Sequence, residues 1–166
     1  RSLLIRLQTP ISATVERRLL RASAAVVVVN PLLAAAVADE AGLEAPVRVY
    51  PNGVDISRFT PGPILRPRQD ALAVGRLVHG KGFEDLIAAW GLVISTHPDA
   101  RLTIVGDGPL RSRLTQLAAS SGVAHTVRFA GALGADRRGD LIELYRHARM
   151  VIQPSHHEGL STVVLE

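Results

Sequence analysis

The chain has 166 residues, a hydrophobic fraction of 47% and a formal net charge of +4. This length suits one domain, or one domain with part of another, and the apolar content excludes intrinsic disorder. The absence of cysteine excludes disulfides and Cys-ligated metal centres. No apolar run approaches the roughly 18 residues that span a bilayer, and no signal peptide is visible, so we expect a cytoplasmic location. Because the sequence starts at Arg1 rather than Met and stops inside an apolar run, we expect it to be part of a longer protein.

The basic residues are arginines with one exception, because Lys81 is the only lysine among 19 basic residues. They are dispersed, and aromatic residues make up only 4% of the chain, so few rings can stack on bases and nucleic acid is not expected as a partner. The densest basic group is Arg17, Arg18 and Arg21, on one predicted helix. This group is typical of a solvated helix face. The alternative, given the apolar residues just before it, is contact with anionic lipid headgroups at the inner face of a membrane.

The first third of the chain predicts the end of one α/β unit, followed by a linker. Residues 24–29 (AAVVVV) are typical of a short, fully buried strand. Asn30 is favoured as the N-cap of a helix that Gly42 ends. Residues 47–50 (VRVY) predict a second strand, and three prolines within residues 56–70 indicate a linker.

A second series of elements starts at residue 71. Short apolar runs predict strands, and apolar residues that recur on one face of a helical repeat predict helices. The expected strands are residues 71–74, 101–105, 126–129 and 150–153. The expected helices are residues 83–96, a helix opened by Asp107 and Pro109 and ended by Gly122, a helix capped by Asp136 that runs to about Arg149, and a new helix at about Leu160. Phe83, Trp90 and Met150 are expected in the core.

Alternating strands and helices with short connections predict the α/β class, with a Rossmann-like, doubly wound parallel sheet and helices on both of its faces. In such sheets, ligands bind beyond the carboxyl ends of the strands. We therefore expect the loops after residues 74, 105, 129 and 153 to lie at one edge of the sheet and to share one cleft.

The loop from Gly75 to Gly82 is favoured as an anion site. It joins a predicted strand to a predicted helix, so backbone N–H groups at the helix start can face a phosphate. Arg76 offers a planar fork of donors and Lys81 a mobile point charge, which together suit a diphosphate. The alternative is that the glycines only allow tight turns and that the cations are solvated.

The same loop is close to the phosphate-binding pattern GxxxxGK[ST] of P-loop NTPases. Gly75, Gly80 and Lys81 match, but Gly82 stands where a hydroxyl residue must hold Mg²⁺. A P-loop-like NTPase is therefore kept as the enzymatic alternative. Residues 106–108 (GDG) lack the third glycine of a dinucleotide fingerprint, so Asp107 is interpreted as an N-cap.

Two carboxylates, Glu158 and Glu166, are eight positions apart in the segment 154–166 (PSHHEGLSTVVLE). On a helix that starts just after Glu158 they would be about 12 Å apart. That spacing exceeds the roughly 5–9.5 Å of a glycosidase pair. It suits a ligand with hydroxyls at both ends and an anion between them, such as a nucleoside diphosphate sugar; the alternative is two solvated carboxylates. His156 and His157 are adjacent and do not converge on a metal, so no metal site is expected.

Taken together, the motifs resemble the retaining glycosyltransferases of family 4, which have the two-Rossmann-domain GT-B fold. Four blocks stand in the family's order: VRVYPNGVDISRF (47–59), AVGRLVHGKGF (73–83), TIVGDGPLRSRL (103–114) and PSHHEGLSTVVLE (154–166). The resemblance spans about residues 11–166. It implies that residues 1–55 end the acceptor-side domain, that residues 56–70 link two domains, and that residues 71–166 form most of a GT-B-type nucleotide-sugar-binding domain that is truncated at its C-terminus.

The resemblance also implies a role for each matching residue. Arg76 and Lys81 would neutralise the donor diphosphate, Glu158 would contact the donor sugar, and these three would carry the catalytic role. Glu166 would hold the ribose hydroxyls. The turn at Ala132 and Leu133 would lie beside the nucleobase. The other implied donor contacts are Gly75 in the diphosphate loop, and Gly159, Leu160, Ser161, Thr162 and Val163 at the helix start. Sugar transfer would proceed with retention and without a metal or other cofactor.

The resemblance leaves the partners open in several respects. The donor base and sugar are not determined, and the acceptor can be a glycan, a lipid or a small molecule. In the family the donor lies between two domains, and most of the first is absent here, so we expect this chain alone to transfer nothing. A catalytically silent nucleotide-binding module is the other alternative, although such a module would be expected to lack Arg76, Lys81 or Glu158.

Overall fold

The computed structural model describes residues 10–43, 46–62 and 69–166. By the density of its internal contacts the chain divides into two compact units. Unit 1 takes in the residues up to Gly53 together with Gly159–Thr162, and unit 2 takes in Val54–Glu158 together with Val163–Glu166. That these units correspond to parts of two domains of a larger protein stays a prediction.

Unit 1 contains two helices and a parallel pair of strands: α1 (Pro10–Ala22), β1 (Val26–Val28), α2 (Pro31–Ala41) and β2 (Val47–Val49). The predicted cap of α2 is confirmed, because Asn30 Oδ1 accepts a hydrogen bond from Leu33 N at 2.7 Å, and Gly42 ends the helix in the left-handed conformation. The expectation of a fully buried first strand is wrong. Val26 and Val28 are buried but Val27 is exposed, because the described residues cover only one face of this pair of strands.

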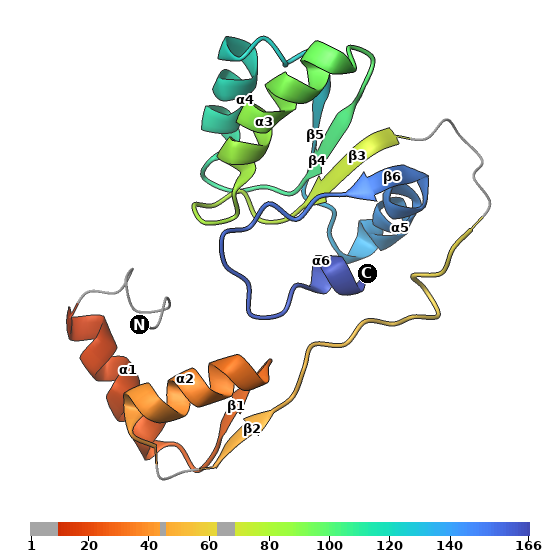
Figure 1. Cartoon of the computed structure of the whole chain (residues 1–166). Helices are drawn as coiled ribbons and strands as arrows, with labels where there is room; N and C mark the ends of the chain where they lie inside the picture. Colours follow the sequence, from red (N-terminus) through yellow and green to blue (C-terminus); the bar gives the residue numbers. More distant parts are fainter. Residues whose placement is uncertain (1–9, 44–45, 63–68) are drawn as a thin grey trace. The chain divides into compact units, whose positions relative to one another are not determined.

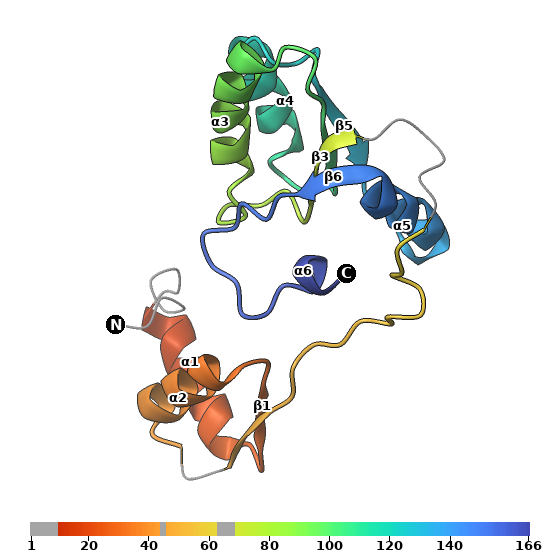
Figure 2. The same ribbon diagram turned by 45° about the vertical axis from the view of Figure 1, so that its right-hand side comes forward.

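Unit 2 is a four-stranded parallel sheet with helices between its strands. In chain order it contains β3 (Gln69–Val74), α3 (Phe83–Thr96), β4 (Leu102–Val105), α4 (Arg111–Ser120), β5 (Val127–Gly131), the 3-10 helix η1 (Ala135–Arg137), α5 (Arg138–His147), β6 (Ala148–Val151) and α6 (Thr162–Leu165). The strand order is β5-β4-β3-β6, and every pair is parallel. Helices α3 and α4 lie on one face of the sheet and α5 on the other (Figures 1 and 2). The expected doubly wound α/β fold is confirmed.

The core of unit 2 follows from the alternation of side chains along β3. Ala71 and Ala73 point into a cluster with Phe83, Ile87 and Trp90 of α3, whereas Leu72 packs with Leu141 of α5 on the opposite face. Successive strand residues point to opposite faces, so β3 must be apolar on both. Phe83 and Trp90 are buried as expected, and Trp90 Nε1 donates to Thr126 Oγ1 at 3.2 Å.

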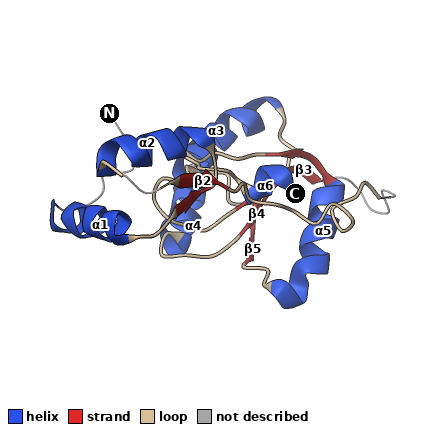
Figure 3. Ribbon diagram, turned by 90° about the horizontal axis from the view of Figure 1, so that it is seen from below, coloured by secondary structure: helices blue, strands red, loops and turns tan. Residues whose placement is uncertain are grey.

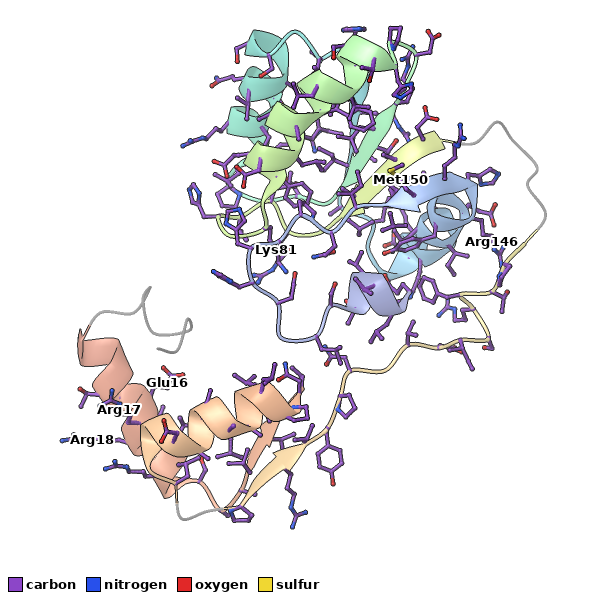
Figure 4. The ribbon with its side chains drawn as sticks, in the orientation of Figure 1. Glu16, Arg17, Arg18, Lys81, Arg146 and Met150 are labelled. Carbon is purple, nitrogen blue, oxygen red and sulfur yellow. The ribbon has the colours of Figure 1, made fainter. Side chains whose placement is uncertain are left out.

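Several local expectations are corrected. Helix α5 ends at His147 rather than near Arg149, because Ala148 and Met150 already pair with Gln69 and Ala71 of β3. Met150 is 56% exposed rather than part of the core, because β6 is the last strand in the described sheet (Figure 4).

The expected helix caps after β4 and β5 are also corrected. Helix α4 starts at Arg111, so Asp107 and Pro109 lie in the preceding loop, where Asp107 Oδ1 accepts from Gly108 N at 2.8 Å. Asp136 lies inside η1 rather than capping α5. In both places the chain makes a further turn before the helix starts, which is a detail that residue preferences at caps do not determine.

Candidate functional site

The strand order places a topological switch point between β3 and β6. The chain runs outward from β3 to β4 and β5, and then returns to the other side of β3 to form β6. Loops that leave neighbouring strands in opposite directions open a crevice at the carboxyl ends, where doubly wound proteins bind ligands. The two loops concerned are residues 75–82, after β3, and residues 152–158, after β6. They carry Arg76, Lys81 and Glu158, three of the predicted site residues.

Glycines allow these loops to approach one another closely. Gly82 has a φ of +67°, and a Cβ at this position would lie 1.9 Å from the carbonyl oxygen of Pro154. Gly106 has a φ of +139°, and a Cβ there would lie 1.8 Å from the carbonyl oxygen of Gly75. Both conformations and both contacts exclude larger residues. Gly82, in the block of residues 73–83, and Gly106, in the block of residues 103–114, therefore allow the carboxyl-edge loops to pack backbone against backbone.

Hydrogen bonds between loops fix the same arrangement. Leu77 N donates to Asp107 O at 2.9 Å, and Leu77 O accepts from Leu110 N at 3.0 Å. On the other side, His156 N donates to Gly80 O at 2.9 Å, and the His156 ring contacts Asp85 at the start of α3. Loop 75–82 is thus hydrogen-bonded to the loop after β4 and to the loop after β6. The backbone that carries Arg76 and Lys81 is therefore fixed.

Lys81 and Glu158, which are 77 residues apart in sequence, meet in this structure. Lys81 Nζ donates to Glu158 Oε1. The same oxygen accepts hydrogen bonds from Gln153 Nε2 at 2.8 Å and Ser155 Oγ at 2.7 Å. Both charged side chains are about three-quarters buried, being 25% and 26% exposed. Figure 4 labels Lys81 on the loop that leads into α3.

The ionised form of Glu158 is stabilised by these partners. Burial alone would raise the pKa of Glu158, but the hydrogen bonds from Lys81, Ser155 and Gln153 and the charge of Lys81 outweigh it, so that this pKa lies below its ordinary value. Oε1 of Glu158 accepts three hydrogen bonds, whereas its Oε2 has no hydrogen-bond partner within the described parts of the chain. Oε2 is therefore the oxygen that can accept from a ligand hydroxyl.

Arg76 differs from Lys81 in having no such partner. It is exposed, and no side-chain hydrogen bond or ion pair joins it to the residues that the structure describes. Gly75, just before it, donates from its backbone N to Val105 O at 2.9 Å, which continues the pairing of β3 with β4. The backbone that carries Arg76 is thus fixed at the end of β3, and its guanidinium is available to an anion.

Glu166 lies in a separate cluster of unit 2 against α5. Its Oε1 accepts from Arg138 Nη2 at 3.0 Å, its Oε2 accepts from Tyr145 Oη at 2.9 Å, and its side chain is only 10% exposed. Burial is the main cause that raises the pKa of the Tyr145 phenol, and the Glu166 carboxylate adds to it. Leu133, predicted beside the nucleobase, packs against the core on this same face of the sheet, and Ala132 is exposed before it.

Residues 159–162 belong to unit 1, and they correct the expected geometry of the two glutamates. Asn30 Nδ2 donates to Gly159 O at 2.5 Å, and Asn52 Nδ2 donates to Leu160 O at 3.0 Å. These carbonyls bind side-chain amides instead of helix N–H groups, and α6 starts only at Thr162 (Figure 3). The premise of one helix from Glu158 to Glu166, with its spacing of about 12 Å, is therefore wrong.

Sequence reasoning missed four residues of these clusters: Gln153, Ser155, Arg138 and Tyr145. Ser155 lies inside a recognised block, so its spacing of three from Glu158 was the available signal. Arg138 and Tyr145 had none, because their partner Glu166 follows 28 and 21 residues later.

Neither a metal site nor a membrane span is found in the part of the chain that the structure describes. In residues 10–43, 46–62 and 69–166, no three His, Cys, Asp or Glu side chains gather as a metal site requires. None of the helices in these ranges is both long and apolar enough to cross a membrane. That transfer needs no metal stays a prediction.

The doubly wound sheet with its cationic loop at the switch point defines a class of α/β protein that binds ligands at the carboxyl ends of its strands. Comparison with known proteins then identifies the family. Residues 62–166 match the family described as Glycosyl transferases group 1, and because this match covers more than half of the chain, the chain belongs to that family. The structure is accordingly of the GT-B type.

Individual proteins agree with this assignment. The chain is 40% identical over 139 residues to the D-inositol 3-phosphate glycosyltransferase of Acidothermus cellulolyticus, which covers 72% of this chain and 30% of that relative. The sucrose-phosphate synthase of Thermosynechococcus elongatus superposes with a TM-score of 0.76 at 24% identity, covering 98% of this chain and 42% of the other. Anabaena Alr3699/HepE in complex with UDP gives 0.68 at 21% identity, covering 92% and 44%. The chain thus spans less than half the length of each.

Proposed function

We propose that the protein transfers a sugar from a nucleoside diphosphate sugar to an acceptor with retention of anomeric configuration, as in family 4. The observation that carries this proposal is the meeting of Lys81 and Glu158 at the switch point, with Arg76 exposed on the same loop as Lys81. The two cations, Arg76 and Lys81, suit a diphosphate. Oε2 of Glu158 can accept a hydrogen bond from a sugar hydroxyl. The UDP in the similar Anabaena structure supports a nucleoside diphosphate as the ligand class.

The chemistry assigned to these residues is electrostatic. The bond between the anomeric carbon and the diphosphate oxygen breaks, and its electron pair leaves with the diphosphate. The acceptor oxygen then bonds to the anomeric carbon on the same face and gives its proton to the departing diphosphate. Arg76 and Lys81 stabilise the charge that develops on the leaving group. Glu158 orients the sugar and stabilises its oxocarbenium-like state.

The ion pair gives Lys81 a defined place before the donor arrives. A lysine side chain loses considerable rotamer freedom on binding an anion, and a carboxylate that already orders it lowers that loss. When a diphosphate binds, Lys81 can turn one of its three N–H donors toward it and keep another on Glu158. The contacts assigned to residues 159–163, Ala132 and Leu133 stay predictions.

We assign an acceptor class of glycan, lipid or small molecule, a cytoplasmic location, and no metal or other cofactor. The alternative of peripheral membrane contact rests on Arg17, Arg18 and Arg21, which are exposed on α1. Figure 4 labels the first two of these arginines. The apolar residues Leu3, Leu4, Ile5 and Leu7, which supported this alternative, lie outside the described residues, and so does the side chain of Ile11.

The decisive experiment is thermal unfolding of the protein with UDP, GDP, ADP and ATP, each with and without Mg²⁺. A ligand at 100 times its dissociation constant stabilises by about 2.7 kcal/mol, which is a shift of roughly 5–10 °C for a chain of this size. We expect one nucleoside diphosphate to give this shift without metal, and Lys81→Ala to remove it. Arg113→Ala is the matched control, because it removes one cation that is 67% exposed on α4.

Catalysis is tested on the full-length protein with the sugar donor of the nucleotide that binds. NMR of the product gives its anomeric configuration, which we expect to equal that of the donor. Stabilisation only by ATP with Mg²⁺ would contradict the proposal in favour of a P-loop-like NTPase. Nucleotide binding without any transfer would favour a catalytically silent module instead.

A further inference from the structure

The carboxylate of Glu166 is held at both of its oxygens. Arg138, from the first turn of α5, donates to Oε1, and Tyr145, two turns further along the same helix, donates to Oε2. Two donors on different oxygens define the plane of a carboxylate, whereas a single donor leaves it free to rotate. Each oxygen keeps a further lone-pair direction for another hydrogen bond. The group is therefore fixed and still able to accept.

A segment before the sheet holds these two donors from the other side. Phe59 lies with its ring under the Arg138 guanidinium, whose central carbon is 5.4 Å from the ring centroid. The same ring meets Tyr145 edge to face, with centroids 5.9 Å apart and an interplanar angle of 75°. Contacts of both kinds are attractive, and they are stronger where water is excluded. Phe59 thus touches both residues that hold Glu166.

The segment that carries Phe59, residues 54–62, is itself attached to α5. Arg146 Nε donates to Thr60 O at 3.0 Å (Figure 4). Asp55 starts a tight turn, because its carboxylate accepts from Ser57 N at 3.1 Å and its carbonyl accepts from Arg58 N at 3.0 Å. This turn presents Phe59 to α5. Phe59 and Thr60, which lie in the expected linker, are therefore in contact with α5, while the linker itself stays a prediction.

We propose that Arg138 and Tyr145 are positioning residues for the ribose, and that Phe59 of the 54–62 segment supports them. This inference rests on the proposed function, together with the ribose-binding role that the resemblance implies for Glu166. A carboxylate held in advance at both oxygens binds two neighbouring hydroxyls without first losing its own rotational freedom. Preference for ribose over deoxyribose is then set by four side chains from three parts of unit 2: the 54–62 segment, α5 and the chain end after α6.

The test is the ribose preference of the full-length protein, measured by calorimetry. Dissociation constants are compared for the nucleoside diphosphate that binds and for its 2′-deoxy and 3′-deoxy analogues. A hydrogen bond to a charged group contributes about 1.5–3 kcal/mol, so we expect a preference for ribose of roughly tenfold or more. Tyr145→Phe keeps the ring against Phe59 but removes the hydroxyl donor, and we expect it to reduce the preference at least about threefold.

Four further variants separate positioning from folding. Tyr50→Phe is the matched control, because it removes the chain's other tyrosine hydroxyl from an exposed site in unit 1 and should leave the preference unchanged. Phe59→Leu should reduce the preference and Phe59→Tyr should restore it. Should Tyr145→Phe fail to fold, Arg138→Gln gives the same test from the other oxygen.

The outcomes separate this inference from the function on which it rests. Binding of no nucleoside diphosphate by the unaltered protein would overturn both. Binding with a ribose preference that survives in Tyr145→Phe, Arg138→Gln and Phe59→Leu would overturn the inference alone, because these contacts would then only stabilise the fold. A preference that falls in these variants and holds in Tyr50→Phe supports it.

Discussion

At the scale of single residues, the candidate site depends on how one carboxylate is shared. Glu158 Oε1 accepts from Lys81, Gln153 and Ser155, which come from two loops. A charged hydrogen-bonded pair that is three-quarters buried is more costly to separate than an exposed one, because each partner would keep its desolvation penalty. Removal of Lys81 or Glu158 alone should therefore affect stability as well as binding.

The lowered pKa of Glu158 predicts a stability difference that depends on pH. A carboxyl whose pKa is lower in the folded state stabilises the fold above its unfolded pKa of about 4.5. That contribution is lost as the pH falls through the lower, folded-state pKa. We therefore expect Glu158→Gln to lower the unfolding temperature at pH 7 and to match the unaltered protein in acid, as measured by calorimetry between pH 7 and pH 3.

Asp99→Asn provides the control for this experiment, since it removes one exposed carboxylate outside the site. A difference between Glu158→Gln and the unaltered protein that stays constant over the whole pH range would show that the carboxylate is not stabilised by its neighbours.

At the scale of elements, glycines allow the loops at the carboxyl edge to approach one another backbone against backbone. Gly82→Ala and Gly106→Ala both place a methyl group within 2 Å of a neighbouring carbonyl oxygen at a positive φ. Left-handed backbone alone costs a non-glycine residue roughly 1–2 kcal/mol. Because the carbonyls of Pro154 and Gly75 must also move, we expect each substitution to destabilise unit 2 by about 2 kcal/mol or more.

Gly91→Ala is the matched control in the same unit. Gly91 lies inside α3, and a Cβ there would meet nothing within 4 Å. Alanine is favoured over glycine in a helix by about 0.5–1 kcal/mol, so this substitution should stabilise the protein. Chemical denaturation of the three variants measures the differences, and a neutral result for Gly82→Ala and Gly106→Ala would mean that the loops separate at little cost.

Sequence patterns of caps and helices predict the start of α2 but not the start of α6. The N-cap of α2 was predicted correctly because Asn30 and its partner Leu33 are three residues apart. The start of α6 was not, because the carbonyls of Gly159 and Leu160 bind side chains of Asn30 and Asn52 from more than 100 residues earlier. Local residue preferences predict a cap between residues three positions apart. They do not predict hydrogen bonds between residues more than 100 positions apart.

At the scale of the whole molecule, the two units differ in how much core they contain. In the described residues of unit 1, the buried apolar side chains are Val26 and Val28, and its sheet has two strands. A two-stranded sheet is marginally stable by itself, whereas unit 2 packs both faces of a four-stranded sheet. Unit 1 should therefore unfold first.

Guanidinium titration can follow the two units separately. Trp90, the only tryptophan of the chain, is buried in unit 2 and reports on that unit by fluorescence, whereas far-UV circular dichroism reports on both. We expect the dichroism to start changing at a lower denaturant concentration than the fluorescence. Val28→Ala, which truncates a buried side chain of unit 1, should move only the early part of the change. Coincident curves would instead show a single cooperative transition.

The sequence by itself determined the order of strands and helices, the parallel doubly wound class, and the loop that carries Arg76 and Lys81. These features are local, because the alternation of apolar residues and the positions of glycine and proline are read within a few residues. Only the tertiary structure decided which side chains meet. The strand order β5-β4-β3-β6 brings Glu158 to Lys81, and the packing of α5 brings Arg138, Tyr145 and Phe59 around Glu166. Such partners are distant in the chain, and their pairing follows from how the elements pack, which no local pattern encodes.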